Sequence, residues 1–351
     1  MRNLHAAVPC LDNLQRPLHD LRISVTDRCN LRCTYCMPCE VFGRGFVFLR
    51  HAELLSFEEI IRVARQCVAL GVRKIRLSGG EPLLRHGIER LVEMLAELRT
   101  NDGKPVDLAM TSNGTLLAKK ARALKDAGLT RLNISLDALD EAIFRRMSGD
   151  RVPPGAVLEG IAAAQEAGLT PVKVNAVVKR GVNESEILPL VRHFRNTGVI
   201  MRFIEYMDVG NTNGWRLDDV VTAREILARI DHEHPLVPIE PDAPNEVAER
   251  WAFQDGSGEI GVIASVSHAF CHTCSRLRLS TDGKLYTCLF ATEGVDLRAL
   301  LRTRSVPSSD ETTLRQRIAA TWHYRTDRYS QQRHEMTEAL PGRIEMSYIG
   351  G

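Results

Sequence analysis

Short apolar runs alternate with amphipathic segments along the first two hundred residues. Runs of β-branched and large apolar residues predict six strands, at 21–26, 73–80, 106–113, 131–137, 171–179 and 199–207. Between them, apolar residues at helical spacing predict helices at 56–72, 87–100, 115–129, 157–169 and 184–198. Strands and helices that alternate in this way form a parallel sheet with crossover helices. The pattern therefore predicts an α/β fold.

The pattern changes after about residue 215. The segment HEHPLVPIEPDAPNE, at 232–246, is rich in proline and acidic residues and is predicted to be a linker or an extended connection. Short strands are predicted at 259–267, 276–281 and 283–290, with a hairpin turn at Asp282-Gly283, and helices are predicted near 296–304 and 309–323. We expect an N-terminal tail at 1–16, a barrel at 17–215 and a C-terminal domain at 216–351.

Composition sets broad limits on partners and location. The 351 residues are 44% hydrophobic and 26% charged, as in ordinary globular proteins. The 46 basic and 44 acidic residues leave a net charge of +2, which gives no overall field for nucleic acid or membranes. No stretch approaches the roughly 18 apolar residues of a membrane span, and the N-terminus lacks the apolar core of a signal peptide. We expect a cytoplasmic protein with no nucleic-acid or membrane partner.

Three cysteines follow the first predicted strand closely. Cys29, Cys33 and Cys36 have the spacing C-x3-C-x2-C. In a reducing cytosol, clustered cysteines bind metal more often than they form disulfides. Three thiolates can hold a 4Fe-4S cluster by three of its irons and leave the fourth iron open for a ligand. A structural zinc site, with Cys39 among its ligands, is the alternative.

A second triad lies about 235 residues further on. Cys271, Cys274 and Cys288 have the spacing C-x2-C-x13-C. The same two interpretations apply, because His268 or His272 could complete a zinc site. The spacing alone does not separate a cluster from zinc.

Two arginines follow the second triad on a predicted strand. Arg276 and Arg278 are two residues apart, so both side chains point to one face of the strand. A guanidinium offers a planar fork for phosphate or for the edge of a base, although a solvated edge strand is the simpler alternative. Cys10 and Cys67 have no such surroundings and are expected to be buried among apolar residues.

The first triad resembles that of the radical S-adenosylmethionine (SAM) superfamily. Tyr35 precedes its third cysteine, and Gly79-Gly80-Glu81-Pro82 after the second strand is similar to the GGEP segment of that superfamily. The resemblance implies that SAM chelates the open iron and is cleaved by one-electron reduction to a 5'-deoxyadenosyl radical. We expect Gly79 and Gly80 to let the backbone pass close to the SAM amine.

Features of the whole chain resemble one family within that superfamily, the GTP 3',8-cyclases (molybdenum cofactor biosynthesis protein A). They are the second triad, RLRLSTDG at 276–283, RFIEYMDVGNTNGW at 202–215 and the terminal Gly350-Gly351. The resemblance implies an incomplete TIM-type (β/α)6 barrel with a C-terminal extension that carries a second 4Fe-4S cluster. It also implies hydrogen abstraction from ribose C3' of GTP and attack of the carbon radical on guanine C8. Reduction and protonation then give 3',8-cyclo-7,8-dihydro-GTP for molybdenum cofactor biosynthesis.

The same resemblance assigns site residues and partners. It gives the first cluster to Cys29, Cys33 and Cys36, and the second cluster to Cys271, Cys274 and Cys288. It places against SAM the residues Tyr35, Gly80, Ser135 and Met207. It places against GTP the residues Arg22, Arg76, Thr111, Lys173, Arg276 and Arg278, the last two as catalytic residues. It further implies that the Gly-Gly tail enters the active site, that a one-electron reductant is needed, that the protein is a homodimer, and that cyclic pyranopterin monophosphate synthase takes the product.

Two other functions remain open from the residues alone. A radical SAM enzyme that modifies peptides or sulfatases would carry auxiliary clusters, although such relatives usually have more C-terminal cysteines. An iron–sulfur or zinc protein that carries electrons or regulates would need neither a GGEP segment nor an arginine-lined cavity. A P-loop GTPase is excluded, because the sequence contains no G-x4-G-K-[ST] run.

Overall fold

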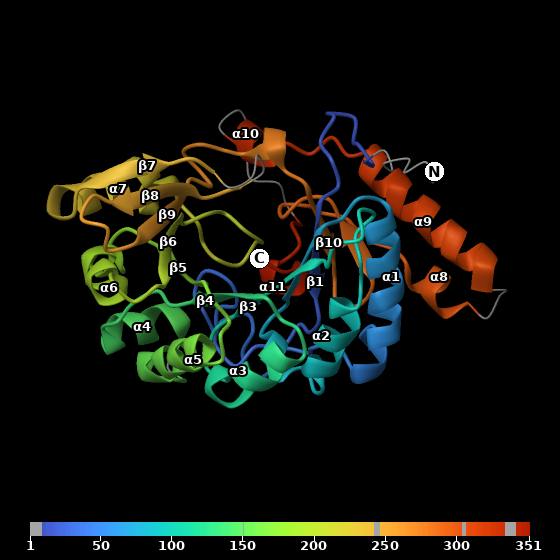
Figure 1. The fold of residues 1–351 in the computed structure, drawn as a ribbon, viewed down its shortest axis with the longest axis horizontal. Helices are drawn as coiled ribbons and strands as arrows, with labels where there is room; N and C mark the ends of the chain where they lie inside the picture. Colours follow the sequence, from blue (N-terminus) through green and yellow to red (C-terminus); the bar gives the residue numbers. More distant parts are fainter. Residues whose placement is uncertain (1–8, 150, 242–245, 304–306, 334–341) are drawn as a thin grey trace.

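The computed structural model describes residues 9–149, 151–241, 246–303, 307–333 and 342–351, and a mixed sheet of twelve strands forms its centre (Figure 1). The strands are β1 (Asp20–Ser24), β2 (Lys74–Ser78), β3 (Asp107–Ser112), β4 (Arg131–Ser135), β5 (Val172–Val178), β6 (Ile200–Glu205), β7 (Leu236–Ile239), β8 (Glu249–Phe253), β9 (Glu259–Ile263), β10 (Arg276–Leu279), β11 (Lys284–Tyr286) and β12 (Val295–Asp296). The helices are α1 (Phe57–Ala69), α2 (Ile88–Ala96), α3 (Leu117–Asp126), α4 (Glu141–Ser148), α5 (Pro154–Glu166), α6 (Ile187–Phe194), α7 (Ala223–Glu233), α8 (Arg298–Arg302), α9 (Pro307–His323), α10 (Tyr329–Gln332) and α11 (Met346–Ile349).

The first six strands form the predicted parallel sheet. They lie side by side in chain order, and α1 to α6 cover the outer face of the curved sheet (Figure 1). β9 continues the sheet in parallel beside β6, and β10 continues it in parallel beside β1. In the described chain, β7 and β12 lie at the two edges of the sheet, so the barrel is incomplete, as predicted. The C-terminal α11 lies inside the curve (Figure 1).

Alternate residues of each strand face the helices and form the core. Leu21 and Ile23 of β1 and Val174 of β5 are fully buried in this way. Cys67 of α1 is fully buried in the same core, as predicted, whereas Cys10 packs against this core but is only partly buried. The interior positions of a TIM-type barrel are usually filled by branched apolar residues. Here the inward positions are mostly polar or charged, and this leaves the inner face available for ligands.

Two helices on one side of the sheet show how local sequence sets the elements. α1 begins at a capping box, in which Ser56 Oγ accepts from Glu59 N at 3.1 Å and the Glu59 carboxylate accepts from Ser56 N at 2.7 Å. α9 packs against α1 and buries Leu314, Ile318 and Trp322, which lie one turn apart. Both helices lie where the sequence predicts them.

Several described elements are not predicted by the sequence patterns. They are α4, α7, α10, α11, β7, β8 and β12, although Thr222 and Glu225 form a capping box for α7. The linker predicted at 232–246 is wrong at residues 236–239, which form β7 and pair antiparallel with β8; residues 242–245 lie outside the described chain. Proline has no backbone N–H to donate to a neighbouring strand. Pro238 is tolerated in β7 because β7 is an edge strand, and no strand pairs with its outer side in the described sheet.

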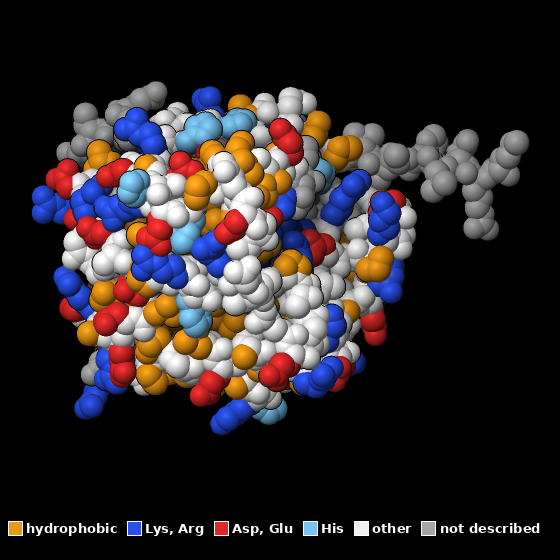
Figure 2. Space-filling view, turned by 60° about the vertical axis from the view of Figure 1, so that its left-hand side comes forward, with side chains coloured by type: hydrophobic (Ala, Val, Ile, Leu, Met, Phe, Trp, Pro, Cys, Tyr) orange, Lys and Arg blue, Asp and Glu red, His pale blue; other side chains and the backbone are white. Residues whose placement is uncertain are grey.

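The surface shows no single sign of charge in the view of Figure 2. Acidic and basic side chains are mixed over this face, in keeping with the net charge of +2. Within the described residues, no helix is both long enough and apolar enough to cross a membrane. The concentration of positive charge lies instead on the inner face of the sheet.

Candidate active site

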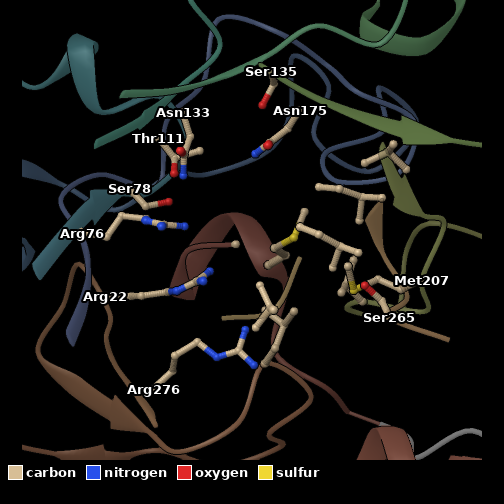
Figure 3. A pocket seen from close by; sticks show the side chains of 18 of the residues that line it. Arg22, Arg76, Ser78, Thr111, Asn133, Ser135, Asn175, Met207, Ser265 and Arg276 are labelled. Atoms are coloured by element: carbon tan, nitrogen blue, oxygen red, sulfur yellow. The ribbon is translucent and has the colours of Figure 1, made fainter. Parts of the chain in front are cut away.

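Three arginines occupy one level of the inner face. Arg278 of β10, Arg22 of β1 and Arg76 of β2 are register partners on adjacent parallel strands, which lie about 4.8 Å apart. Figure 3 shows Arg22, Arg76 and Arg276 pointing into the same cavity. Burial and the neighbouring arginines lower the pKa of both Arg22 and Arg278 well below the ordinary value. Such a row of like charges is unfavourable unless an anion lies against it.

A polar row continues across the next strands. Thr111 of β3, Asn133 of β4 and Lys173 of β5 are register partners. Burial, and then the charge of Arg202, lower the pKa of Lys173 to about 8. Arg202 of β6 donates through Nη2 to Asn133 Oδ1 at 2.9 Å and through Nε to Asn175 Oδ1 at 3.1 Å. The sequence analysis missed Arg202, although its inward position on a predicted strand is a signal that could have identified it.

These rows line a cavity of about 540 Å³. Every residue predicted to bind a cluster, SAM or GTP lies on its wall, and so do Lys74 and Arg131, which were not predicted. Within the described chain, Arg76 Nε, Thr111 Oγ1 and Asn133 Nδ2 are buried without a hydrogen-bond partner. Buried polar atoms rarely lack a partner. These three atoms therefore indicate a polar ligand in the cavity.

The first cysteine triad lies in the loop after β1. Cys33 O accepts from Cys36 N at 3.0 Å, which bends the loop into a turn. Leu31 N and Asn113 Nδ2 lie 3.4 and 3.8 Å from Cys29 Sγ, as donors to a thiolate would. Burial raises the pKa of Cys29 to about 11 and also raises the pKa of Cys33 and Cys36. The thiols therefore need a positive partner to ionise, and the irons of a cluster supply one.

The two glycines of the GGEP segment pack directly on that cysteine loop. Gly80 N donates to Thr26 O at 2.8 Å, and the next amide donates to Arg28 O at 2.8 Å. A Cβ would lie 2.5 Å from Thr26 O if added to Gly79, and 2.5 Å from the carbonyl carbon of Arg28 if added to Gly80. The cysteine loop itself already requires these glycines. The close approach of these glycines to SAM stays a prediction, and the packing on the cysteine loop is a second reason for glycine here.

The residues predicted to contact SAM come from four places in the chain: Tyr35 from the cysteine loop, Gly80 from the segment after β2, Ser135 from the end of β4 and Met207 from the loop after β6. Tyr35 Oη donates to Asp137 Oδ2 at 2.8 Å, so the cysteine loop is tied to the chain just after Ser135. Burial raises the pKa of Asp137 to about 6. Figure 3 shows Ser135 and Arg276 at opposite ends of the cavity, with Met207 at its side. The predicted SAM contact Ser135 and the predicted GTP contact Arg276 thus lie on opposite sides of one cavity.

β10 brings the second triad beside β1. Cys271 begins a short turn, Cys271–Thr273, that leads through Cys274 into the strand. Arg16 Nη1 donates to Cys271 O at 2.9 Å, and Arg325 Nη1 donates to Cys274 O at 2.7 Å. Burial alone would raise the pKa of Cys274, but Arg276 and Arg325 lower it to about 6. One thiol of this triad is therefore held ready to ionise.

The extra ligands that a zinc site would need lie away from the cavity. The His268 side chain is 80% exposed and lies 3.5 Å from Glu249, while His272 and Cys39 are exposed. All nine cysteines are free thiols. In the described residues, no three His, Cys, Asp or Glu side chains are arranged to hold a single metal ion. Each triad does place three free thiols on the wall of the cavity, and three is the number of thiolates that a 4Fe-4S cluster with one open iron takes.

The C-terminal tail enters the cavity, as predicted. α11 ends at Ile349; the carbonyl of the next residue, Gly350, accepts a hydrogen bond from Arg278 Nη1, and Gly351 lies on the cavity wall. Gly350 has a φ of 77°, and a Cβ there would lie 3.2 Å from the Ser78 side chain. Glycine is therefore favoured at this position by both its backbone angle and its surroundings.

Comparison with known proteins first defines the class. The model of the Radical SAM superfamily matches residues 23–194, and that of Molybdenum Cofactor Synthesis C matches residues 199–331. The structure is similar to SuiB of Streptococcus suis bound to S-adenosylmethionine, with a TM-score of 0.61 and 16% identity over 89% of this chain and 69% of that chain. At this identity, the likeness establishes the fold. The chain has the fold of radical SAM enzymes.

Curated relatives then define the family. The GTP 3',8-cyclase of Acidothermus cellulolyticus is 51% identical over 98% of this chain and 99% of that protein. The GTP 3',8-cyclase of Xanthomonas axonopodis pv. citri is 47% identical over 98% of this chain and 99% of that protein. The GTP 3',8-cyclase of Staphylococcus saprophyticus is 45% identical over 97% of this chain and 98% of that protein. The chain belongs to the GTP 3',8-cyclase family. The peptide-modifying and electron-carrier alternatives are therefore set aside.

Proposed function

We propose that this chain converts GTP into 3',8-cyclo-7,8-dihydro-GTP, the first step of molybdenum cofactor biosynthesis. One observation carries the proposal: two cysteine triads and a row of three arginines, Arg278 fully buried and Arg22 and Arg76 half-buried, share one cavity. A reaction that joins ribose C3' to guanine C8 needs the radical source, the base and the phosphates held in fixed relative positions. A single elongated cavity with these groups on its wall supplies that condition.

The proposal requires two 4Fe-4S clusters and SAM. The first cluster is held by Cys29, Cys33 and Cys36, and the second by Cys271, Cys274 and Cys288. SAM lies against Tyr35, Gly80, Ser135 and Met207. When bound, these groups supply a 5'-deoxyadenosyl radical that takes the hydrogen atom from ribose C3'. The protein's part is to hold the thiolates, to position both ligands and to exclude water.

GTP lies at the arginine-rich end in this proposal. Its contacts are Arg22, Arg76, Thr111, Lys173, Arg276 and Arg278. A triphosphate carries close to four negative charges, and it would relieve the repulsion within the arginine row, whose pKa values are lowered by burial and mutual proximity. Arg276 follows Cys274 on β10 and Arg278 belongs to the row itself, so as catalytic residues they orient the nucleotide while the second cluster binds its guanine.

Arg202 belongs to the same site as a positioning group. Asn133 and Asn175 hold its guanidinium at 2.9 and 3.1 Å, so its orientation is set before any ligand binds. Burial lowers its pKa to about 10, which still leaves the side chain charged at neutral pH. A preset charge costs no reorganisation during the reaction.

Further elements of the proposal concern the whole protein. We propose a tail at 1–16, of which 1–8 lie outside the described residues, a radical SAM part at 17–215 and an auxiliary part at 216–351. We also propose a cytoplasmic homodimer that receives electrons from a one-electron reductant. Its product would pass to cyclic pyranopterin monophosphate synthase.

The test is an anaerobic assay of the reconstituted protein. Iron and sulfide are counted, and dithionite, SAM and GTP are then added while 5'-deoxyadenosine and the cyclised nucleotide are measured. We expect about eight irons per chain and 5'-deoxyadenosine formation that depends on GTP. Four irons per chain would contradict the role given to the second triad. SAM cleavage that ignores GTP would contradict the substrate.

Matched arginine variants test the GTP site. Arg278→Ala should lower formation of the cyclised product by at least about 100-fold, because a buried charge on the phosphate row is lost. It should retain cleavage of SAM without GTP, because the first triad is unchanged. Arg122→Ala, on the exposed face of α3, is the control and should behave like the parent protein. Equal product formation by Arg278→Ala and Arg122→Ala would refute the assignment.

A further inference from the structure

The C-terminal tail places a backbone carbonyl group against the guanidinium of Arg278. The Gly350 carbonyl accepts from Arg278 Nη1, and Arg278 is 2% exposed within the arginine row. α11 has only four residues, so its own hydrogen bonds cannot fix the tail in place. Some other contact must therefore hold the two terminal glycines against the cavity.

The loop after β6 provides one such contact through Glu345. The Glu345 carboxylate accepts from Asn211 N at 2.9 Å and from Thr212 Oγ1 at 3.1 Å. It lies so close to Gly210 that a Cβ there would be 2.7 Å from Glu345 Cδ. Asn211 also exchanges hydrogen bonds with Arg343, donating from Nδ2 to its carbonyl and accepting from its amide at 3.3 Å. The residue just before α11 is thus bound to one short loop.

The same loop contains a buried junction at Asp208. Its Oδ1 accepts from Arg333 Nε at 2.9 Å, and its Oδ2 accepts from Arg343 Nη1 at 2.8 Å and from the Tyr329 hydroxyl. The Asp208 side chain is 5% exposed, so these donors replace water completely. Tyr329 stacks on Phe290 with ring centroids 4.5 Å apart. One carboxylate therefore joins the β6 loop, the tail and the segment before the tail.

The junction reaches both ends of the cavity. Asp208 follows Met207 on the cavity wall, and the amide of Phe290 lies 3.5 Å from Cys288 Sγ of the second triad. Asp208, which binds Arg343 of the tail, is therefore next in sequence to Met207, the predicted SAM contact. Phe290, which stacks on Tyr329, lies beside Cys288 of the second triad. A shift of the loop after β6 would therefore move the tail and the group that faces Arg278.

We propose that Asp208 and Glu345 are positioning residues that hold the C-terminal glycines on Arg278. The proposal rests on the proposed function, because it gives the held tail a role in the reaction of GTP. Neither carboxylate touches the substrate in this scheme. Each acts through the tail, Glu345 at the residue before α11 and Asp208 through Arg343.

Hydrogen exchange of the peptide 342–351, followed by mass spectrometry, tests the positioning directly. In Glu345→Ala, protection of this peptide should fall at least ten-fold, because the tail loses the contacts of the carboxylate with Asn211 N and Thr212 Oγ1. Glu345→Gln should keep much of the protection, because its carbonyl still accepts from Asn211 N. The control is Glu159→Ala on the exposed side of α5, which should match the parent protein.

Activity provides the second readout. Glu345→Ala should lower the GTP-dependent kcat at least ten-fold and leave the KM for SAM unchanged. Gly210→Ala should give the same pattern, because its methyl group displaces Glu345, and combining it with Glu345→Ala should add little further loss. If Glu345→Ala or Gly210→Ala folds poorly, Glu345→Gln keeps the test decisive, because it retains an acceptor for Asn211 N.

The possible results separate the two proposals. Unchanged protection in both Glu345→Ala and Gly210→Ala would overturn the positioning role, and so would lost protection with a normal GTP-dependent kcat. A parent protein that forms no 5'-deoxyadenosine in response to GTP would instead overturn the proposed function. In that case the exchange data would still report whether Glu345 holds the tail.

Discussion

Replacing Gly80 with alanine should disable the first triad without changing a cysteine. The new Cβ would lie 2.5 Å from the Arg28 carbonyl carbon and 3.1 Å from Cys29 N. Carbon atoms pack at about 3.5–4.0 Å, so the overlap is roughly 1 Å. Because the neighbours are backbone atoms, no rotamer relieves it, and the cysteine loop must move. A displacement of about 1 Å can lower a rate by about 100-fold.

The matched control is Gly155→Ala in the first turn of α5. A Cβ there meets no atom within 4 Å, so this variant should be neutral or more stable by up to about 1 kcal/mol. Gly80→Ala should cleave SAM about 100-fold more slowly under dithionite. Its free energy of unfolding in urea should fall by about 1–3 kcal/mol. Full iron content, normal stability and a normal rate in Gly80→Ala would refute the reasoning.

Three further predictions concern charge and the cysteines. Burial raises the pKa of Glu81 to about 7, so its contribution to stability is complete below about pH 4.5 and is lost as the pH rises through about 7. Between these pH values the free energy of unfolding of the parent protein in urea should fall by up to about 3 kcal/mol, and that of Glu81→Gln should not fall. If the unfolding free energies of the parent protein and of Glu81→Gln change in parallel with pH, this prediction is wrong. Arg16→Ala leaves the fully buried Asp12 carboxylate without its partner at 2.6 Å and should cost about 3–5 kcal/mol in urea unfolding, whereas a loss below about 1 kcal/mol would argue against a buried pair. Cys33→Ser should abolish SAM cleavage while Cys39→Ser, at an exposed thiol, retains it; cleavage by the Cys33 variant would exclude the first triad as the cluster site.

Much of the fold could be predicted because its signals are local. The six parallel strands and their helices follow from apolar periodicity, which each segment carries by itself. β7 was missed because Pro235 and Pro238 resemble a linker, and only its place at the edge of the sheet makes a strand with proline acceptable. α4 was missed because it has only eight residues, although Asp140 caps it at Ile143 N.

The candidate site divides in the same way. The sequence by itself determined the cysteine triads, because their ligands lie within eight and eighteen residues of chain, and it determined the inward side of each strand through its alternation. It also indicated the arginine pair beside the second triad. These features depend on neighbours along the chain.

Only the tertiary structure decided which residues meet. The row of Arg278, Arg22 and Arg76 depends on the register between β10, β1 and β2, whose residues lie up to about 250 positions apart in the chain. The same holds for Gly350 on Arg278 and for the Asp208 junction. Register and long-range contacts are set by packing of the whole sheet, and no segment of sequence carries that information alone.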